Sequence, residues 1–489
     1  CYLTGRLLAA LVWNDLPAPT IAGVPVLGAG VLAGQLWVYG LAHIPWNLAT
    51  LLLPWLVLGV ALQKRLGIAV RSDYRRTTAA AREDWSRLDA LSIVLVVGGA
   101  VLAITYVLNL LTEPLTGFDA FADWLFKAKV YYLSQAVNQS LLVLPGTGDP
   151  GGLGTSVDFV LSRQYPPLFP TMVATIYTII GRPDGLTGKA INVIFMVSST
   201  AAIYTLVRSI LGARWAVVFG FLALALPTFA KALYSSDYMG YADYAVGACM
   251  LLGLVNLHLA ASICPPGTRL LAAIFALEAA LVKDEGVVFL VAVLVVLSVL
   301  ILRPAWSEGR AGIRRVPRLL PFALLLVPVV GWRLSVSAAG FQQVHVPSIS
   351  GFVQGLPYVP LNAIRIASDL RGALSLHNDF GWLAIAIALS LALLLVDRTR
   401  YALAAGVVVY MQLLGYWVVW LYSPNLDFLV VGTYERLAIQ LAPMLLVLLA
   451  IGLHPYLTAK PAVGQVDGNA PDQARGTEAY SLRIEAASS

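Results

Sequence analysis

Acidic and basic residues stand unusually close together at 115–133, LTGFDAFADWLFKAKVYYL, directly after a long apolar run. Asp119, Asp123 and Lys127 are spaced four residues apart, so a helix would place all three along one stripe. The simplest interpretation is a surface helix with an Asp123–Lys127 ion pair. A carboxylate at the boundary of a hydrocarbon layer is costly unless it is paired or faces water, so these acids are also candidates for function.

A second polar stretch, YSSDYMGYADYAVG at 234–247, sets Asp237 and Asp243 among several tyrosines. Asp243 suits simple capping at the start of the helix expected from residue 244. Two acids and several tyrosines exceed what a cap needs. Together they resemble the wall of a site for hydroxyl-rich ligands.

Two further stretches combine charges of both signs. VKDEG at 282–286 holds Lys283 and Glu285 between apolar runs, and TYERLAIQLAP at 433–443 holds Arg436. A charged turn and a snorkelling arginine are the ordinary interpretations. An arginine on the side of the membrane opposite the basic loops is better explained by phosphate recognition, because guanidinium binds phosphate in a fixed, bidentate geometry.

The familiar motifs of soluble enzymes are missing from the sequence, so soluble-type nucleotide hydrolysis and zinc proteolysis lose support. The sequence contains no HExxH, CxxC, GxSxG or GxxxxGK[ST] pattern. His377 lies with His345 and Asp379 in the segment 337–380, and histidines in loops are usually incidental. Whether a metal takes part stays open, because carboxylates without a spacing signature do not define a site. The oxygen ligands available to Mg²⁺ or Mn²⁺ are Asp119, Asp123, Asp237 and Asp243.

The elements that position these residues follow from the composition. The chain has 489 residues, of which 59% are hydrophobic and only 12% charged, and its mean hydropathy is +0.79. Apolar runs near 20 residues recur along it, and backbone groups in lipid must bond within their own segment. We therefore expect an all-α polytopic membrane protein. The net charge of +6 is attributed to basic loops and not to nucleic-acid binding.

The hydropathy pattern predicts about twelve transmembrane helices in one membrane domain, 1–456, followed by a disordered cytoplasmic tail, 457–489. Lys and Arg collect in the loops 63–88 and 304–318, which should face the cytoplasm. The expected helices are 21–42, 47–62, 90–111, 187–208, 214–230, 244–263, 269–282, 286–303, 319–336, 381–396, 402–421 and 437–453.

With this orientation the polar stretches all face outside. The first outer loop, 112–186, should contain an interfacial helix at 115–133 with its aromatic rings at headgroup level. The run 167–181 should be re-entrant or lie on the surface, because a full crossing would invert the charge bias of everything downstream. The remaining outer segments are 231–243, 283–285, 337–380 and 422–436.

Five stretches in this order resemble bacterial members of the GT-C superfamily of polytopic glycosyltransferases. They are GFDAFADWLFKAKVYY (117–132), YPPLFP (165–170), YADYAV (241–246), VKDEG (282–286) and ERLAIQLAP (435–443). The resemblance spans about residues 90–453, the GT-C-like core. It departs from the family at Phe118 and Phe121, where relatives commonly carry Trp.

The resemblance implies an enzyme that takes a sugar from a polyprenyl-phosphate carrier at the outer face of the inner (plasma) membrane. Asp119 matches the essential acid of the first outer loop. Arg436 and Lys283 would face the carrier phosphate, and Asp243 would bind the sugar. The full set of expected substrate-binding residues is Asp123, Lys127, Tyr165, Asp237, Asp243, Lys283, Glu285, His377 and Arg436.

This set suggests a mechanism. Asp119 would accept the proton of the acceptor hydroxyl, whether glycan, lipid or protein, as it attacks the anomeric carbon. Cations that hold the departing phosphate would replace a second acid, and one direct displacement would invert the anomeric centre. A divalent metal, Mg or Mn, is not required by this scheme and is not excluded. A transporter or flippase for a lipid-linked or small polar substrate is the alternative from another class.

Overall fold

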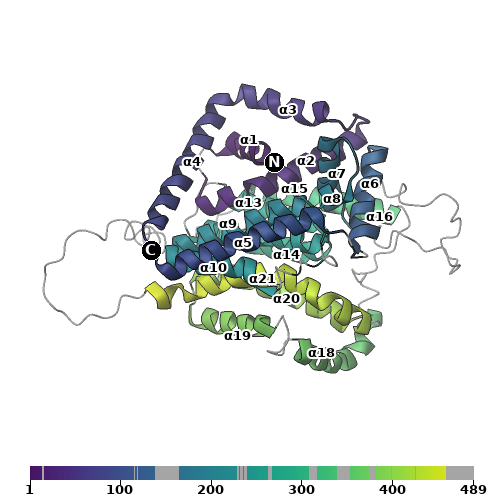
Figure 1. Cartoon of the computed structure of the whole chain (residues 1–489). Coiled ribbons are helices and arrows are strands. Elements are labelled where there is room, and N and C mark those ends of the chain that lie inside the picture. The colour runs from purple at the N-terminus through teal and green to yellow at the C-terminus, as the bar shows by residue number, and fades with distance from the viewer. Residues whose placement is uncertain are drawn as a thin grey trace, which may run out of the picture.

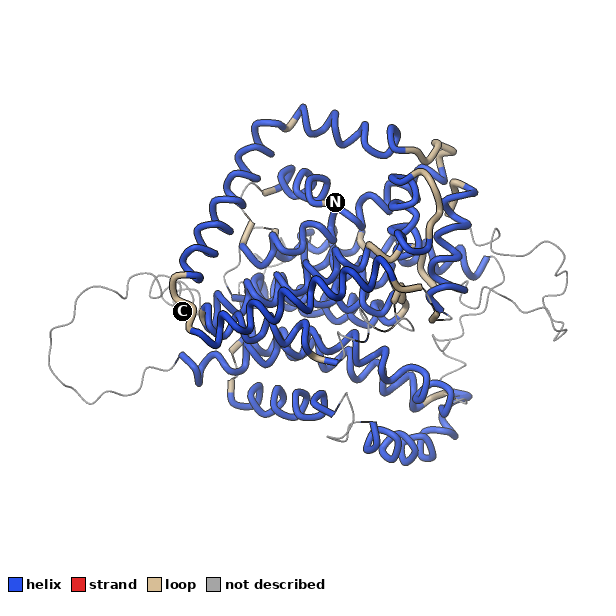
Figure 2. Tube along the Cα trace, viewed as in Figure 1, coloured by secondary structure: helices blue, strands red, loops and turns tan. Residues whose placement is uncertain are grey.

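The structure is a computed structural model of the chain. It describes residues 1–13, 16–114, 116–117, 119–137, 165–227, 231, 235, 239–262, 267–307, 317–338, 353–373, 381–397, 399–423 and 426–458. Within these ranges every regular element is a helix, and most helices run roughly side by side in one bundle (Figures 1 and 2). The predicted all-α fold is confirmed. Asp237, His377 and the tail from 459 lie outside the described residues.

The first half of the chain supplies helices α1 to α10. They are α1 (Tyr2–Val12), α2 (Ala18–Leu41), α3 (Leu48–Ala61), α4 (Gln63–Trp85), α5 (Ala90–Thr112), the π-helical segment η1 (Asp119–Trp124), α6 (Leu125–Ser134), α7 (Leu168–Ile180), α8 (Gly185–Gly188), α9 (Ile191–Leu211) and α10 (Ala213–Ala225).

The second half supplies the remaining helices. They are α12 (Ala242–Ser262), α13 (Thr268–Val282), α14 (Glu285–Ser307), α15 (Leu320–Leu324), α16 (Leu326–Ala338), the short 3-10 turn η4 (Leu356–Tyr358), α18 (Val359–Ala373), α19 (Gly381–Val396), α20 (Arg400–Leu421) and α21 (Leu426–Thr458).

Eight helical segments of the described chain are long and apolar enough to cross a membrane, or nine if the bent pair α3–α4 counts as one span. Each of the twelve predicted segments overlaps a helix, but the count of twelve is not confirmed. The apolar helices α10 and α19 have 13 and 16 residues. At 1.5 Å per residue they are about 20–24 Å long, shorter than a hydrocarbon core of about 30 Å.

Helix α12 forms the centre of the bundle. Its whole length is buried, and it packs against α13, α21, α20 and α9. A helix that is apolar on all sides is expected inside a bundle and not at its lipid-facing surface. The first turn of α12, which carries Asp243, is therefore held in place by several neighbouring helices.

The segment after α5 differs from the expected interfacial helix. Asp119 begins the π-helical turn η1, and π-helical turns often occur at functional sites. Trp124 and Tyr131, which we expected at headgroup level, are buried against the protein. Helix α7, predicted not to cross the membrane fully, has 13 residues, most of them buried, and packs against α6 and α2.

The predicted basic loop 63–88 is mostly the helix α4, which turns away from α3 by 90°. In Figure 1, α4 runs across the left-hand ends of the bundle helices. Asp73 fixes its middle: the carboxylate accepts from Arg6 Nε at 2.6 Å and from the Tyr2 hydroxyl at 2.8 Å. Asp84 fixes its end by accepting from Arg208 Nε at 2.7 Å.

We expect the substitution Arg6→Gln to destabilise the protein by about 3–5 kcal/mol, because it leaves the buried Asp73 carboxylate without its cation. The thermal unfolding temperature of the detergent-solubilised protein should fall accordingly. Arg75→Gln, on the exposed side of the same helix, is the matched control and should change little. Equal shifts in the two variants would contradict this account of how α4 is held.

Candidate active site

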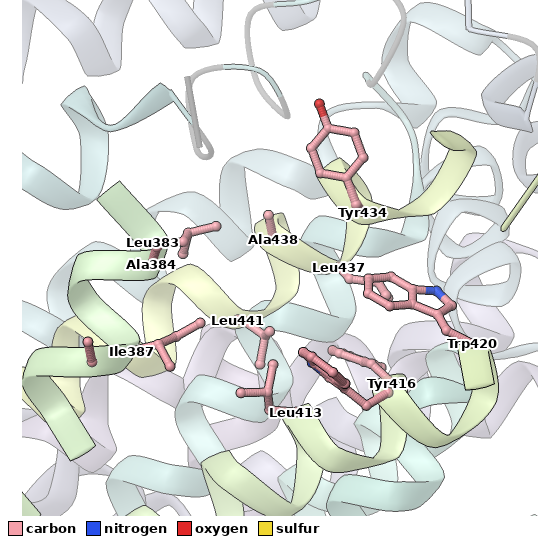
Figure 3. A pocket seen from close by; sticks show the side chains of 12 residues that line it. Leu383, Ala384, Ile387, Leu413, Tyr416, Trp420, Tyr434, Leu437, Ala438 and Leu441 are labelled. Carbon is pink, nitrogen blue, oxygen red and sulfur yellow. The ribbon is translucent and has the colours of Figure 1, made fainter. Parts of the chain in front are cut away.

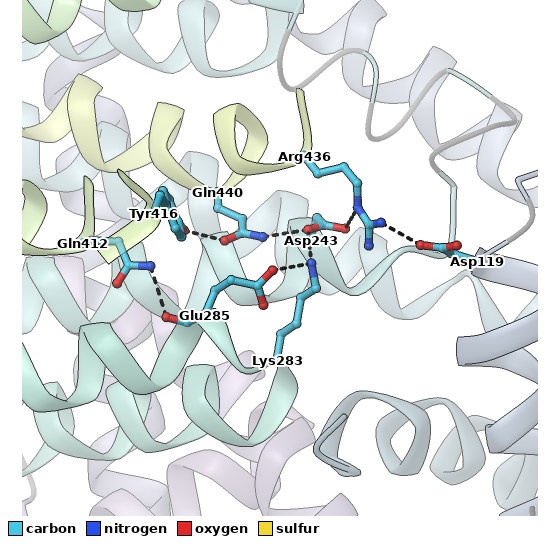
Figure 4. Close-up of polar contacts among 8 residues, drawn as sticks. All are labelled: Asp119, Asp243, Lys283, Glu285, Gln412, Tyr416, Arg436 and Gln440. Atoms are coloured by element: carbon cyan, nitrogen blue, oxygen red, sulfur yellow. Dashed lines mark hydrogen bonds and ion pairs between the residues drawn. The ribbon is translucent and has the colours of Figure 1, made fainter. Parts of the chain in front are cut away.

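Arg436 joins two acids from distant parts of the chain (Figure 4). Its Nε donates to Asp243 Oδ2 at 2.9 Å, and its Nη1 donates to Asp119 Oδ2 at 2.7 Å. Arg436 lies in α21, Asp243 in the first turn of α12, and Asp119 at the start of η1. Three residues that the sequence analysis selected separately therefore meet at one end of the bundle.

Lys283 extends this cluster toward α14. Its Nζ lies 2.7 Å from Asp243 Oδ1 and 2.8 Å from Glu285 Oε1. The residue has an extended backbone between α13 and α14, which turns its side chain toward Asp243. Three carboxylates and two cations now stand together, so the cluster of Asp119, Asp243, Lys283, Glu285 and Arg436 has a formal charge of 2 − 3 = −1.

The acids of the cluster differ in their access to solvent. The side chain of Asp243 is 1% exposed, whereas that of Asp119 is 31% exposed. Asp243 is therefore an internal charge that holds Arg436 and Lys283 in position. Asp119 is the most exposed of the three carboxylates, and Glu285 is also partly exposed, at 23%.

Two polar atoms of the cluster have open hydrogen-bonding capacity. Arg436 Nη2 and Glu285 Oε2 are buried, and no described residue hydrogen-bonds to either. Buried polar groups are nearly always paired, so a ligand or water can fill these two positions. The first can donate to an anion, and the second can accept from a hydroxyl or another donor.

Tyr165 connects the cluster to the predicted Asp123–Lys127 pair. Its ring stacks on Trp124 at 5.2 Å between centroids, and the Nζ atoms of Lys127 and Lys283 each lie 5.8 Å from its centre. Lys127 and Asp123 form a buried ion pair of 2.8 Å. Burial raises the pKa of Tyr165 well above its ordinary value, so its hydroxyl stays protonated at neutral pH.

A further ion pair and the aromatic ring of Tyr241 lie next to the cluster. Lys231 Nζ donates to Glu435 Oε1 at 3.2 Å. The Arg436 guanidinium lies over the Tyr241 ring at 5.0 Å. Burial and the charge of Asp119 raise the pKa of Tyr241 to about 12. This tyrosine is therefore a neutral wall beside the exposed acid.

The sequence analysis missed the amide residues that support Asp243. Gln440 Nε2 donates to Asp243 Oδ1 at 2.6 Å, and the Tyr416 hydroxyl donates to Gln440 Oε1 at 2.5 Å. Gln412 Nε2 donates to the backbone carbonyl of Glu285 at 3.1 Å. A signal was present in the sequence: Gln440 follows Arg436 by four residues, and Tyr416 follows Gln412 by four, each pair on one helical face.

Carboxylates that we considered as metal ligands are engaged by cations. Within the described ranges, no three His, Cys, Asp or Glu side chains are grouped so that they could hold a metal ion. Asp119 and Asp243 contact Arg436, and Asp123 contacts Lys127. The charges next to these carboxylates are thus supplied by the chain itself.

An apolar cavity of about 310 Å³ lies beside the cluster, between α19, α20 and α21 (Figure 3). Tyr416 is part of its wall and also donates to Gln440, so one hydrogen-bonded chain of side chains links the cavity to Asp243. Its lining is otherwise almost entirely aliphatic and aromatic: Leu383, Ala384, Ile387, Ala388, Leu413, Trp417, Trp420, Tyr434, Leu437, Ala438 and Leu441.

Comparison with known proteins gave no match among family models, curated proteins or solved structures.

Asp284, the neighbour of Lys283, points to a different partner. Its Oδ1 accepts from Arg333 Nη2 in α16 at 2.6 Å, and it is not part of the charged cluster. Burial raises the pKa of Asp284 to about 6, although Arg333 opposes the shift. The raised pKa brings the titration of this carboxyl closer to neutral pH.

We expect Asp284→Asn to change the pH dependence of stability. Because the folded-state pKa is raised above 3.8, protonated Asp284 stabilises the fold below about pH 4, and this stabilisation is lost as the pH rises through about 6. Asn imitates the protonated acid, so the variant should gain up to about 3 kcal/mol over wild type between pH 4 and 7. Unfolding temperatures across this range test it, with the exposed Asp369→Asn as control. A pH-independent difference would refute the assignment.

Proposed function

We propose that this protein is an inverting glycosyltransferase that moves a sugar from a polyprenyl-phosphate carrier to an acceptor hydroxyl. The observation that carries the proposal is the 2.7 Å contact between Asp119 and Arg436, 317 residues apart in the chain. It places a partly exposed carboxylate beside a guanidinium that has an unfilled donor. Proton removal and stabilisation of a leaving phosphate need this pair of groups.

In this reaction the acceptor oxygen attacks the anomeric carbon while Asp119 takes the hydroxyl proton. The bond between the anomeric carbon and the phosphate oxygen breaks, and its electron pair goes to the phosphate. Arg436 and Lys283 stabilise that charge. One displacement inverts the anomeric centre. Asp243, which holds both cations, does not need to contact the reacting atoms.

Binding of the donor would also change the contacts of the base. Arg436 donates to Asp119 in the structure. A donor phosphate that binds Arg436 would compete for this interaction and leave the Asp119 carboxylate free to accept from the acceptor hydroxyl.

The apolar cavity supports a lipid-linked donor. Its wall is aliphatic and aromatic, and one wall residue, Tyr416, is hydrogen-bonded through Gln440 to Asp243. A ligand with a charged end at Arg436 and an isoprenoid chain in the cavity would match both environments. The donor would enter from the outer half of the plasma membrane, and the acceptor would be a glycan, lipid or protein.

A transporter or flippase is the second candidate because of Glu278. This acid is buried within α13 and has no ion-pair partner among the described residues. An acid inside a membrane domain is a typical part of an ion pathway. Movement of a labelled lipid-linked sugar across proteoliposomes, without formation of a new glycoside, would favour this candidate over the transferase.

We expect Asp119→Asn to lower the transfer rate by roughly 10²–10⁴-fold while donor affinity changes little, because the variant loses only the proton acceptor. Arg436→Gln should instead weaken donor binding as well. The assay supplies purified protein in proteoliposomes with radiolabelled polyprenyl-phosphate sugars and candidate acceptors, and NMR gives the anomeric configuration of the product. Lys129→Gln, an exposed lysine on α6, is the control. Equal turnover in Asp119→Asn and wild type would contradict the assignment of Asp119 as the base. A product with retained anomeric configuration would contradict a single displacement.

We expect Ala384→Trp, which adds a ring at the cavity wall, to raise KM for long-chain donors more than for a donor with one or two isoprene units. The added ring occupies space that only the longer chain needs. Leu389→Trp, exposed on the same helix, is the matched control and should leave the ratio of the two KM values unchanged. The same ratio of KM values in wild type and both variants would show that the isoprenoid chain of the donor does not bind in this cavity.

A further inference from the structure

Helix α4 is joined at both ends to apolar helices with exposed hydrophobic side chains. Before it, Leu56 and Val60 of α3 are 62% and 69% exposed, and after it, Val94 of α5 is 66% exposed. Such surfaces need hydrocarbon around them. Both ends of α4 therefore lie where hydrocarbon stops, and the 90° bend after α3 turns the helix along that boundary.

One face of α4 is fixed to the protein. Asp73 and Asp84 are eleven residues apart, about three helical turns, so both anchors lie on the same stripe. Four basic residues lie on the opposite face: Lys64, Arg71, Arg75 and Arg82. Arg82, for example, is nine residues beyond Asp73, about two and a half turns. All four are exposed, and no ion pair is recorded for any of them in the described structure.

A hydrophobic flank adjoins the basic stripe. Tyr74 and Trp85 each follow an anchoring aspartate by one residue, about 100° around the helix, and are 68% and 65% exposed. Ile68, 64% exposed, adds apolar surface beside the stripe. Tyrosine and tryptophan favour the level of lipid headgroups, where one end of the ring is apolar and the other is wet.

We propose that the exposed face of α4 is a binding surface for anionic phospholipid headgroups. The segment 64–87 has seven Lys and Arg and three Asp and Glu, a net charge of 7 − 3 = +4. Basic side chains beside aromatic ones suit a lipid phosphate with its glycerol backbone, and both ends of the helix are already at the membrane boundary. A lipid can reach this surface without any further protein. The inference does not depend on the proposed enzymatic activity.

The test uses the full chain in detergent and measures binding of fluorescent phosphatidylglycerol against the same label on phosphatidylcholine. The variant K64Q/R71Q/R75Q/R82Q removes the basic stripe. The control variant K129Q/R182Q/R365Q/R371Q removes four exposed basic residues elsewhere, so both variants have the same net charge. Thermal unfolding of both variants checks that they fold.

We expect the stripe variant to bind phosphatidylglycerol at least about tenfold more weakly than wild type, because each basic residue near an anionic surface contributes a severalfold gain in affinity. The preference of the wild-type protein for phosphatidylglycerol over phosphatidylcholine should also shrink as the salt concentration is raised. The control variant should bind like wild type. Equal binding by the stripe variant and wild type, or equal losses in both variants, would overturn the proposal. Equal binding by the stripe variant and wild type would favour an acidic partner in solution for the basic face. Equal losses in both variants would indicate an effect of net charge alone.

Discussion

The buried charge of Asp243 is the constraint on which the rest of the site depends. A carboxylate that is 1% exposed is stable only if its hydrogen-bonding positions are filled and its charge is balanced. Arg436 and Gln440 of α21 fill two positions, and Lys283 from the α13–α14 turn fills a third. The first turn of α12 therefore fixes how α21 and the α13–α14 turn approach it.

This arrangement separates support from reactivity. Asp243 cannot meet a ligand without moving its neighbours, but it holds two cations in fixed positions. Asp119 uses the outer side of Arg436 and remains partly exposed. In the proposed reaction, such a site would be organised before the substrate arrives, which is the condition under which charges stabilise a transition state effectively. The excess negative charge of the cluster would then be reduced when Asp119 takes a proton.

Much of this could be predicted from the sequence, and the failures have physical causes. Hydropathy located the helices because apolar runs in a membrane protein can only be helical. Hydropathy alone could not establish the count of twelve spans, because an apolar run can also form a helix shorter than the hydrocarbon core, as in α10 and α19. It assigned α4 to a loop, because two aspartates anchored to distant partners give no periodic apolar signal. Asp119, Asp243, Lys283 and Arg436 were found as separate polar stretches. Their contacts depend on tertiary packing, and so does the role of Gln440, whose amide looks ordinary in sequence.

The two ends of the bundle treat charge in opposite ways, and this difference follows from what each end can contact. At the end with Asp119, every cation of the cluster is paired with an acid of the chain, so a ligand must compete for a place. Such competition favours a ligand with both an anionic group and other contacts, because the anion alone would only exchange one ion pair for another. At the end with α4, four basic side chains have no internal partner in the described structure, so an anionic surface can bind there without displacing anything. Under the two proposals, selectivity therefore belongs to the first end, and broad electrostatic attachment to the second.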